Sequence, residues 1–187
     1  MLTLALLCSA ATVAAQSSPD NATDNDVTVQ VKKNGEVIVV DVGFSVAATP
    51  QEAWAVLTDF DRMASFVSNL ASSKVLSRNG NVLQIEQKGK AARGVLSFDF
   101  ESVREITLTP PRAIHTHLIS GNMKKFDGVT LISPENGGTR VTYHGESVPT
   151  VWVPPVVGTG FIASEVREQF QEMRAEILRR KNGAATK

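Results

Sequence analysis

Residues 49–60, TPQEAWAVLTDF, hold the transition from a strand to a helix on which the fold depends. Thr49 and Glu52 have the spacing of a capping box, and Pro50 stands at the first helical position. The apolar residues that follow recur at helical spacing. On the other side, residues 36–48 alternate between apolar and polar side chains, as in a strand with one buried face. The sequence therefore predicts a strand that runs directly into a helix.

A second short helix, which Asp59 or Asp61 can cap, leads into a long run of strands. Residues 73–143 alternate in polarity, and turn signals divide them into about six strands. A long amphipathic helix follows at residues 163–180, and only this helix is long enough to cover the apolar face of the sheet. We therefore predict an α+β fold, in which a curved antiparallel sheet wraps around a long C-terminal helix, with two short helices after the first strand.

Both ends of the chain are expected to lie outside this domain. The first residues have no charged side chain, and Val13-Ala14-Ala15 before Gln16 fits a signal-peptidase site, which predicts an exported protein, either periplasmic or secreted. The expected segments are a signal peptide at 1–15, a flexible linker with room for a short strand at 16–34, the folded domain at 35–181 and a disordered tail at 182–187.

Composition narrows the classes of function. Lys plus Arg and Asp plus Glu number 19 each, so the net charge is zero and nothing draws the protein electrostatically to nucleic acid. The single cysteine excludes an internal disulfide and a cysteine-based zinc site. His115 and His117 have the polar parity of their strand and are expected to face solvent. The sequence predicts no catalytic residue, metal or cofactor, and it indicates no oligomeric state.

One charged side chain breaks the apolar pattern. Arg104 has the parity of Phe100 and Ile106, so it points toward the covering helix unless a bulge near Ser102 turns Val103 inward instead. A buried guanidinium needs an acceptor, which the head group of a ligand could supply. The expected cavity between sheet and helix gives these candidate ligand-binding residues: Phe98, Phe100, Arg104, Tyr143, Trp152, Phe170 and Met173.

Two of these candidates have a second interpretation. Tyr143 is either a polar contact for the ligand or a core tyrosine with a satisfied hydroxyl. Trp152 lies in an uncharged, proline-containing loop, where it can form the rim of the cavity, pack beneath the last helix or touch a membrane. The loop Val151–Val157 is therefore a candidate for transient membrane contact during ligand exchange.

The order of these elements resembles the START-like (SRPBCC) helix-grip superfamily. The subgroup described as polyketide cyclase/dehydrase and lipid transport, which includes coenzyme Q-binding proteins, is the most similar. The resemblance covers roughly residues 35–181 and is carried by residues 49–60, Phe66-Val67, Phe126-Asp127-Gly128, residues 138–143 and the long last helix. It implies the helix-grip fold and a hydrophobic ligand in the cavity.

Two functions are consistent with these observations. The first is non-enzymatic binding or transport of a hydrophobic small molecule, such as a lipid, an isoprenoid or a polyketide-like compound. The second is a cyclase or dehydratase that acts on a polyketide-like substrate in the same cavity. An enzyme would need a titratable group inside the cavity, and only Arg104 and Tyr143 have the required parity.

Overall fold

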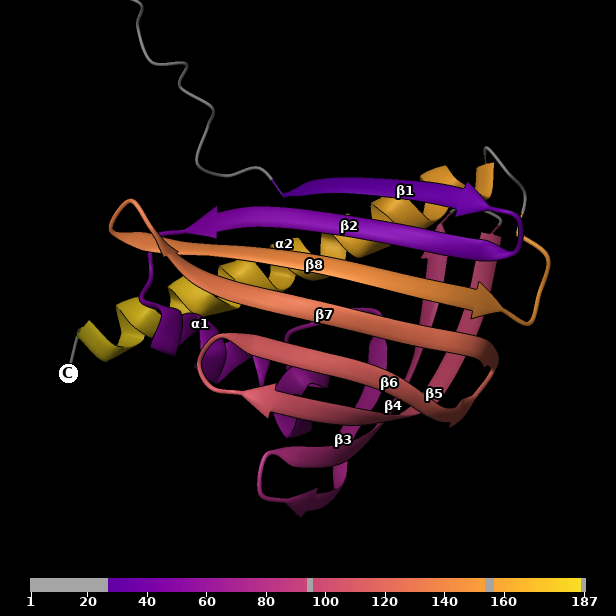
Figure 1. The fold of residues 1–187 in the computed structure, drawn as a ribbon. Coiled ribbons are helices and arrows are strands. Elements are labelled where there is room, and N and C mark those ends of the chain that lie inside the picture. Colours follow the sequence, from indigo (N-terminus) through magenta and orange to yellow (C-terminus); the bar gives the residue numbers. More distant parts are fainter. Residues whose placement is uncertain (1–26, 94–95, 154–156, 186–187) are drawn as a thin grey trace, which may run out of the picture.

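The computed structural model describes residues 27–93, 96–153 and 157–185. Figure 1 shows the chain as a single curved sheet with a long helix across it. The elements are, in chain order, β1 (Thr28–Asn34), β2 (Val37–Val46), α1 (Pro50–Leu57), the 3₁₀ helix η1 (Phe60–Ser65), β3 (Leu70–Asn79), β4 (Val82–Arg93), β5 (Leu96–Thr109), β6 (Ala113–Gly121), β7 (Met123–Glu135), β8 (Gly138–Pro149) and α2 (Val157–Ala185).

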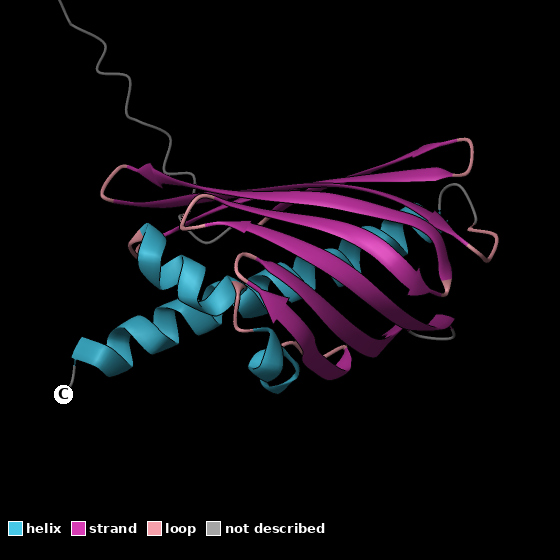
Figure 2. Cartoon of the chain, turned by 60° about the horizontal axis from the view of Figure 1, so that its bottom comes forward, coloured by secondary structure: helices cyan, strands magenta, loops and turns pink. Residues whose placement is uncertain are grey.

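All strands belong to one antiparallel sheet with the order β1-β2-β8-β7-β6-β5-β4-β3. The strands after η1 form a meander, and β8 pairs with β2, so the first and last parts of the chain meet in the sheet. The sheet curves around α2, which lies across its concave face (Figures 1 and 2). This arrangement confirms the predicted α+β fold. None of the described helices is both long and apolar enough to cross a bilayer.

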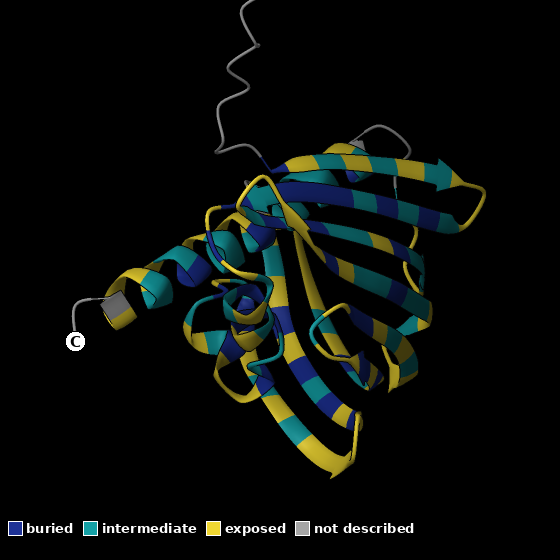
Figure 3. Cartoon of the chain, turned by 60° about the vertical axis from the view of Figure 1, so that its left-hand side comes forward, coloured by how far each residue is buried: buried dark blue, intermediate teal, exposed yellow. Residues whose placement is uncertain are grey.

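The hydrophobic core lies between the concave face and the helices. Buried and more exposed residues largely alternate along the strands, and the buried set faces the core beneath the helices (Figure 3). Phe44, Val141 and Ile106 are buried from the sheet side, and Ile177 is buried from α2. Helix α1 and η1 close one end of this core with the buried residues of both helices: Ala53, Val56, Leu57, Phe60 and Met63. Among the described residues, no helix other than α2 lies at the opposite end, beside the first turns of α2.

The start of α1 is as predicted, whereas the second short helix differs. The Thr49 hydroxyl accepts a hydrogen bond from the Glu52 amide at 3.2 Å, and the Glu52 carboxylate accepts one from the Thr49 amide at 2.7 Å. The second helix is the 3₁₀ helix η1, and Asp59 makes no side-chain cap there. Its carboxylate instead accepts hydrogen bonds from Arg62 at 2.8 Å and from Arg180 of α2 at 2.6 Å. Because its carboxylate binds Arg180, which is distant in sequence, Asp59 does not cap η1.

The boundaries of the domain need correction. Strand β1, which was allowed for within the expected linker 16–34, pairs with β2 along its whole length, so the fold begins before residue 35. Helix α2 begins at Val157 rather than at residue 163, and it continues through residues expected in a tail to Ala185. The expected signal peptide and most of the expected linker lie outside the described residues.

Candidate functional site

The candidate site lies between α2 and the concave face of the central strands. Tyr143 on β8 and Phe170 on α2 face each other, with ring centroids 5.5 Å apart, and Phe170 also contacts Phe44 at 6.2 Å. Met173, one turn further along α2, packs partly buried against the same core, as does Phe100 of β5. The structure thus brings four of the predicted residues to one side of the sheet.

Arg104 points toward this space because β5 keeps its alternation. The pairing of β5 with β4 is continuous, and Arg104 lies opposite the buried Ile85. The irregularity in the pairing with β6 falls on the β6 side, where Ile119 is the extra residue between the partners of Val103 and Arg104. The bulge considered near Ser102 therefore does not occur in β5, and Arg104 follows the concave parity of Ser102 and Ile106.

The Nε atom of Arg104 is buried without a polar partner among the described residues, while the residue as a whole is half-buried. The guanidinium carbon lies over the ring of Phe126 of β7, 5.4 Å from its centroid. Burial lowers the pKa of Arg104 to about 10, and the interaction with the Tyr143 oxygen opposes this shift. The group therefore remains a cation at neutral pH.

The side chain of Tyr143 packs over two glycines and lies near Arg104. Its ring lies over Gly128 and Gly145, which face each other on β7 and β8. A Cβ atom at Gly128 would stand 2.9 Å from the tyrosine ring, and a Cβ atom at Gly145 would overlap the hydroxyl itself. Burial raises the pKa of Tyr143 to about 12, with the positive charge of Arg104 acting in the opposite direction. The hydroxyl therefore stays protonated and can donate a hydrogen bond at neutral pH.

Exposure increases along β5 away from Arg104. Ile106 and Leu108 on one side of it are buried, whereas Phe100 is half-buried and Phe98 is 36% exposed on the other. The Phe100 ring lies against Gly89 of β4, where a Cβ atom would stand 2.5 Å from it. Phe98 contacts Phe161, in the first turns of α2, edge to face at 5.5 Å. Along this side of β5, exposure is thus lowest at Ile106 and Leu108 and highest at Phe98, which contacts the start of α2.

Trp152 lies outside this enclosed space. Its side chain is 75% exposed, and the neighbouring Val151 is 55% exposed. Lys33 of β1 stands 5.9 Å from the tryptophan ring centroid and donates a hydrogen bond to the Val153 carbonyl at 2.8 Å. Packing of Trp152 beneath the last helix, one of the three interpretations, is therefore wrong. Residues 154–156 of the candidate membrane-contact loop lie outside the described residues.

Two contributors to the site were missed by the sequence reasoning. Phe126 and Phe161 make the aromatic contacts to Arg104 and Phe98. Phe126 belongs to the Phe126-Asp127-Gly128 motif, but its proximity to Arg104 depends on the registers of three strands. The space that Gly128 and Gly145 leave for Tyr143 could have been suspected from two glycines within strand patterns, which often mark close approach of another group.

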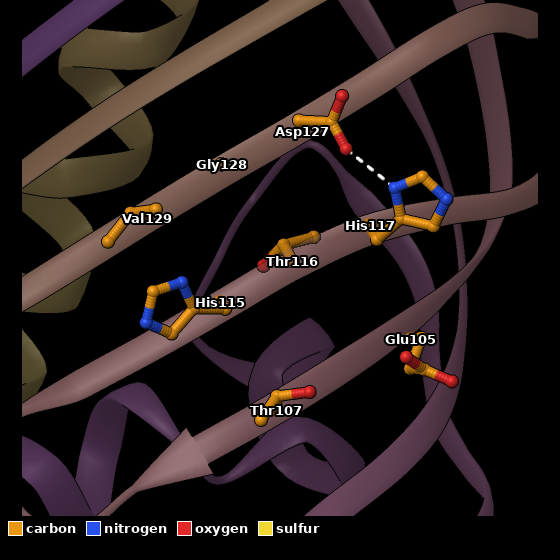
Figure 4. A pocket seen from close by; sticks show the side chains of 8 residues that line it. All are labelled: Glu105, Thr107, His115, Thr116, His117, Asp127, Gly128 and Val129. Atoms are coloured by element: carbon orange, nitrogen blue, oxygen red, sulfur yellow. Dashed lines mark hydrogen bonds and ion pairs between the residues drawn. The ribbon is translucent and has the colours of Figure 1, made fainter.

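The convex face carries the histidines, as predicted. His115, His117 and His144 are exposed. His117 Nδ1 lies 2.6 Å from Asp127, and His144 Nδ1 lies 2.7 Å from Asp41. A depression of about 210 Å³ on this face is lined by Glu105, Thr107, His115, Thr116, His117, Asp127, Gly128 and Val129, whose side chains are drawn in Figure 4. No group of three or more metal-ligating side chains occurs among the described residues.

The titratable groups of the concave face have pKa values far from neutrality. On the concave face, the two titratable groups near each other are Arg104 and Tyr143, and both pKa values lie far above neutrality. A general acid or base works best with a pKa near the operating pH. The pair can supply fixed hydrogen-bond donors and one positive charge to an apolar space.

Comparison with solved structures finds close similarity in fold at low sequence identity. A protein from Thermus thermophilus superimposes with a TM-score of 0.64 at 16% identity, covering 75% of this chain and 97% of that one. The Zhui aromatase/cyclase from Streptomyces sp. R1128 gives 0.64 at 15% identity, covering 77% and 95%. A STAR-related lipid transfer protein from Xanthomonas axonopodis gives 0.62 at 12% identity, covering 81% and 98%.

Sequence comparison places the chain in a family. Comparison with curated proteins finds no match. The family model described as polyketide cyclase / dehydrase and lipid transport matches residues 46–173, which include α1, the central strands and most of α2. The chain belongs to the polyketide cyclase / dehydrase and lipid transport family, and it has the START-type helix-grip fold.

Proposed function

We propose that the protein binds and transports a hydrophobic small molecule between α2 and the concave face of the sheet, without catalysing a reaction. The observation that carries this proposal is the incomplete burial of apolar side chains beneath α2. Phe100 and Tyr143 from the sheet, and Val166 and Met173 from α2, pack against the core but keep accessible surface. This accessible apolar surface is the area that a hydrophobic ligand beneath α2 would cover.

The energy for such binding would come from apolar area. Removing apolar surface from water contributes about 25 cal/mol per Å², so covering these side chains favours any ligand of matching shape. The family description includes lipid transport, and the Xanthomonas axonopodis neighbour is described as a lipid transfer protein. Both are consistent with a carrier.

Export and membrane contact form part of the proposal. The uncharged start of the sequence supports export, and the exposed pair Val151 and Trp152 supports transient contact with a bilayer. Tryptophan favours the boundary between water and lipid, because its ring is apolar and its N–H is polar. Such contact would let the ligand pass between membrane and protein.

An enzymatic role is the second candidate, favoured by the similarity to the Zhui aromatase/cyclase. Tyr143 beside Arg104 is the group pair that could orient a substrate carbonyl. However, the Tyr143 pKa of about 12 makes the hydroxyl a weak acid, and Arg104 remains charged. A carrier needs neither group to exchange a proton, so the geometry favours binding.

Native mass spectrometry of protein purified from its own compartment tests the proposal. We expect a co-purifying apolar molecule that is released unchanged, and we expect fluorescent apolar probes to compete for its place. Release of a chemically altered molecule would favour the enzyme instead. Protein that carries no such molecule and binds no apolar probe would overturn the carrier proposal.

A further inference from the structure

The strongest unexplained feature of the molecule is the charge on Arg104. Arg104 is half-buried, and a guanidinium nitrogen that is buried without an acceptor is unfavourable, because burial removes its hydration and no described residue replaces it. Its Nε atom is buried and has no hydrogen-bond partner among the described residues. Phe126 offers only its ring face to Arg104. The hydroxyl of Tyr143 is protonated at neutral pH, so it brings no negative charge.

The strands around Arg104 supply no neutralising carboxylate. Its neighbours across β5 are Ile85 on β4 and Leu118 on β6. The acidic residues of β5, Asp99, Glu101 and Glu105, are exposed on the opposite parity. Asp127 of β7 also has the outward parity, and it is paired with His117 on the convex face. Among the described residues no carboxylate of the sheet or of α2 forms an ion pair with Arg104, so a bound molecule would have to supply the negative charge.

The apolar surroundings and the single guanidinium limit the negative charge of a ligand head group to about one. A single guanidinium balances one negative charge, and its planar donors match the two oxygens of a carboxylate. A phosphate monoester carries about 1.5 to 2 negative charges at neutral pH, so it would bring uncompensated charge into an apolar space. Tyr143, which leans over Gly145 toward the same row of side chains, adds a neutral hydroxyl donor.

The apolar part of the ligand would extend along β5. The buried residues Ile106 and Leu108 close one direction, whereas exposure increases from Phe100 to Phe98 in the other. Six residues of strand separate Arg104 from Phe98, a length of about 20 Å at roughly 3.3 Å per residue. The aromatic contact between Phe98 and Phe161 marks the outer end of this path.

We propose, building on the binding function above, that the ligand is an amphipathic carboxylic acid of the long-chain fatty acid type. Its carboxylate pairs with Arg104 and accepts a hydrogen bond from Tyr143, and its apolar chain runs past Phe100 toward Phe98. The head group enters first, and the chain end lies nearest the start of α2.

The test compares a fluorescent long-chain fatty acid, its methyl ester and an alkyl phosphate of equal chain length, each titrated into the delipidated full-length protein. We expect the acid to bind about tenfold or more tightly than the ester, as a charged hydrogen bond requires. Arg104→Met should remove this preference while ester binding is retained. Tyr143→Phe should weaken acid binding by a smaller factor, and the exposed Arg78→Met should change nothing.

The outcomes separate this inference from the proposed function. Acid and ester binding with equal affinity to the wild type, or a preference for the phosphate, would overturn the carboxylate assignment but leave the carrier intact. No binding of any probe would overturn both. If Arg104 serves only to pack on Phe126, Arg104→Met should lower the unfolding temperature and weaken acid and ester alike. Should that variant not fold, the wild-type comparison and Tyr143→Phe decide the question.

Discussion

The hydroxyl of Tyr143 occupies the position that a side chain at Gly145 would need. The two residues lie two apart on β8, and a Cβ atom at Gly145 would overlap the tyrosine hydroxyl. The backbone of Gly145 is thus the surface on which the ring rests. The direction of the hydroxyl, and its nearness to Arg104, depend on a residue that has no side chain of its own.

Gly145→Ala should therefore displace Tyr143. We expect a loss of about 1 to 3 kcal/mol in unfolding free energy, because the added methyl group overpacks a filled site. Acid binding should weaken along with it. Chemical denaturation monitored by circular dichroism measures the first effect. Gly160→Ala is the control, since a Cβ atom there meets nothing within 4 Å and alanine favours the helix. Equal stability of Gly145→Ala and the wild type would contradict the described contact.

Phe100→Trp should block the space along β5. The ring already lies against Gly89, so the larger indole must extend away from the sheet. We expect the affinity for a fluorescent fatty acid or quinone analogue to fall about tenfold, with an unchanged circular dichroism spectrum. Leu131→Trp, on the exposed convex face, is the matched control. If both variants bind like the wild type, the ligand lies elsewhere.

Glu176 should make the protein sensitive to acid. Its buried carboxylate accepts hydrogen bonds from Arg179 at 2.6 and 2.8 Å and from Arg180 at 2.6 Å. The Arg179 hydrogen bonds, with those of Arg180, lower its pKa to about 2 against the opposing effect of burial. Because the folded pKa lies below the ordinary value of 4.5, this stabilisation is complete above pH 4.5 and is lost as the pH falls toward 2.

Glu176→Gln tests this origin of acid sensitivity. We expect the substitution to lower the unfolding free energy by about 2 kcal/mol at pH 7 and by much less near pH 2. Glu168→Gln, at an exposed position of the same helix, should have little effect at either pH. Urea denaturation across this range gives the comparison. A constant difference between variant and wild type at all pH values would exclude the ionised carboxylate as the cause.

Trp152→Ser should weaken association with lipid vesicles. Burial of a large apolar side chain contributes about 1.5 to 3 kcal/mol, so we expect about a tenfold loss in a vesicle sedimentation assay. Leu76→Ser removes another exposed apolar side chain, on edge strand β3, and serves as the control. Equal effects of the two substitutions would argue against a specific role of Trp152.

Export predicts cleavage between Ala15 and Gln16, in the part of the chain outside the described residues. N-terminal sequencing of protein recovered from the periplasm or the medium should begin at Gln16. Protein that retains Met1 and remains in the cytosol would refute this prediction.

Local sequence patterns predicted the features that depend on neighbouring residues in the chain, such as helix caps and the faces of strands. The capping box at Thr49 formed as expected, and alternation gave Arg104 its correct face because β5 has no bulge. The start of α2 was misplaced because Gly158 and Gly160 disfavour a helix by propensity. Contact between Phe161 and Phe98 supports that first part of the helix, and no local pattern shows such a contact.

The composition of the site depended on registers between strands. Phe126 meets Arg104 only because β5, β6 and β7 pair with one extra residue, Ile119, in β6. Likewise, the sequence predicts Asp59 as a helix cap, but its carboxylate accepts a hydrogen bond from Arg180, which lies far away in the chain. These contacts depend on how distant segments pair. The local sequence pattern does not predict the strand registers, so it could not predict the contacts either.

If a ligand pairs with Arg104 as proposed, the amount of folded protein would depend on the supply of that ligand. A ligand that binds only the folded state adds about 2.7 kcal/mol of stability at a hundredfold excess over its dissociation constant. Cells degrade proteins according to the fraction that is transiently unfolded, so a shift of this size changes abundance several-fold. The protein would accumulate where its cargo is plentiful and be cleared where it is scarce, without a separate regulator.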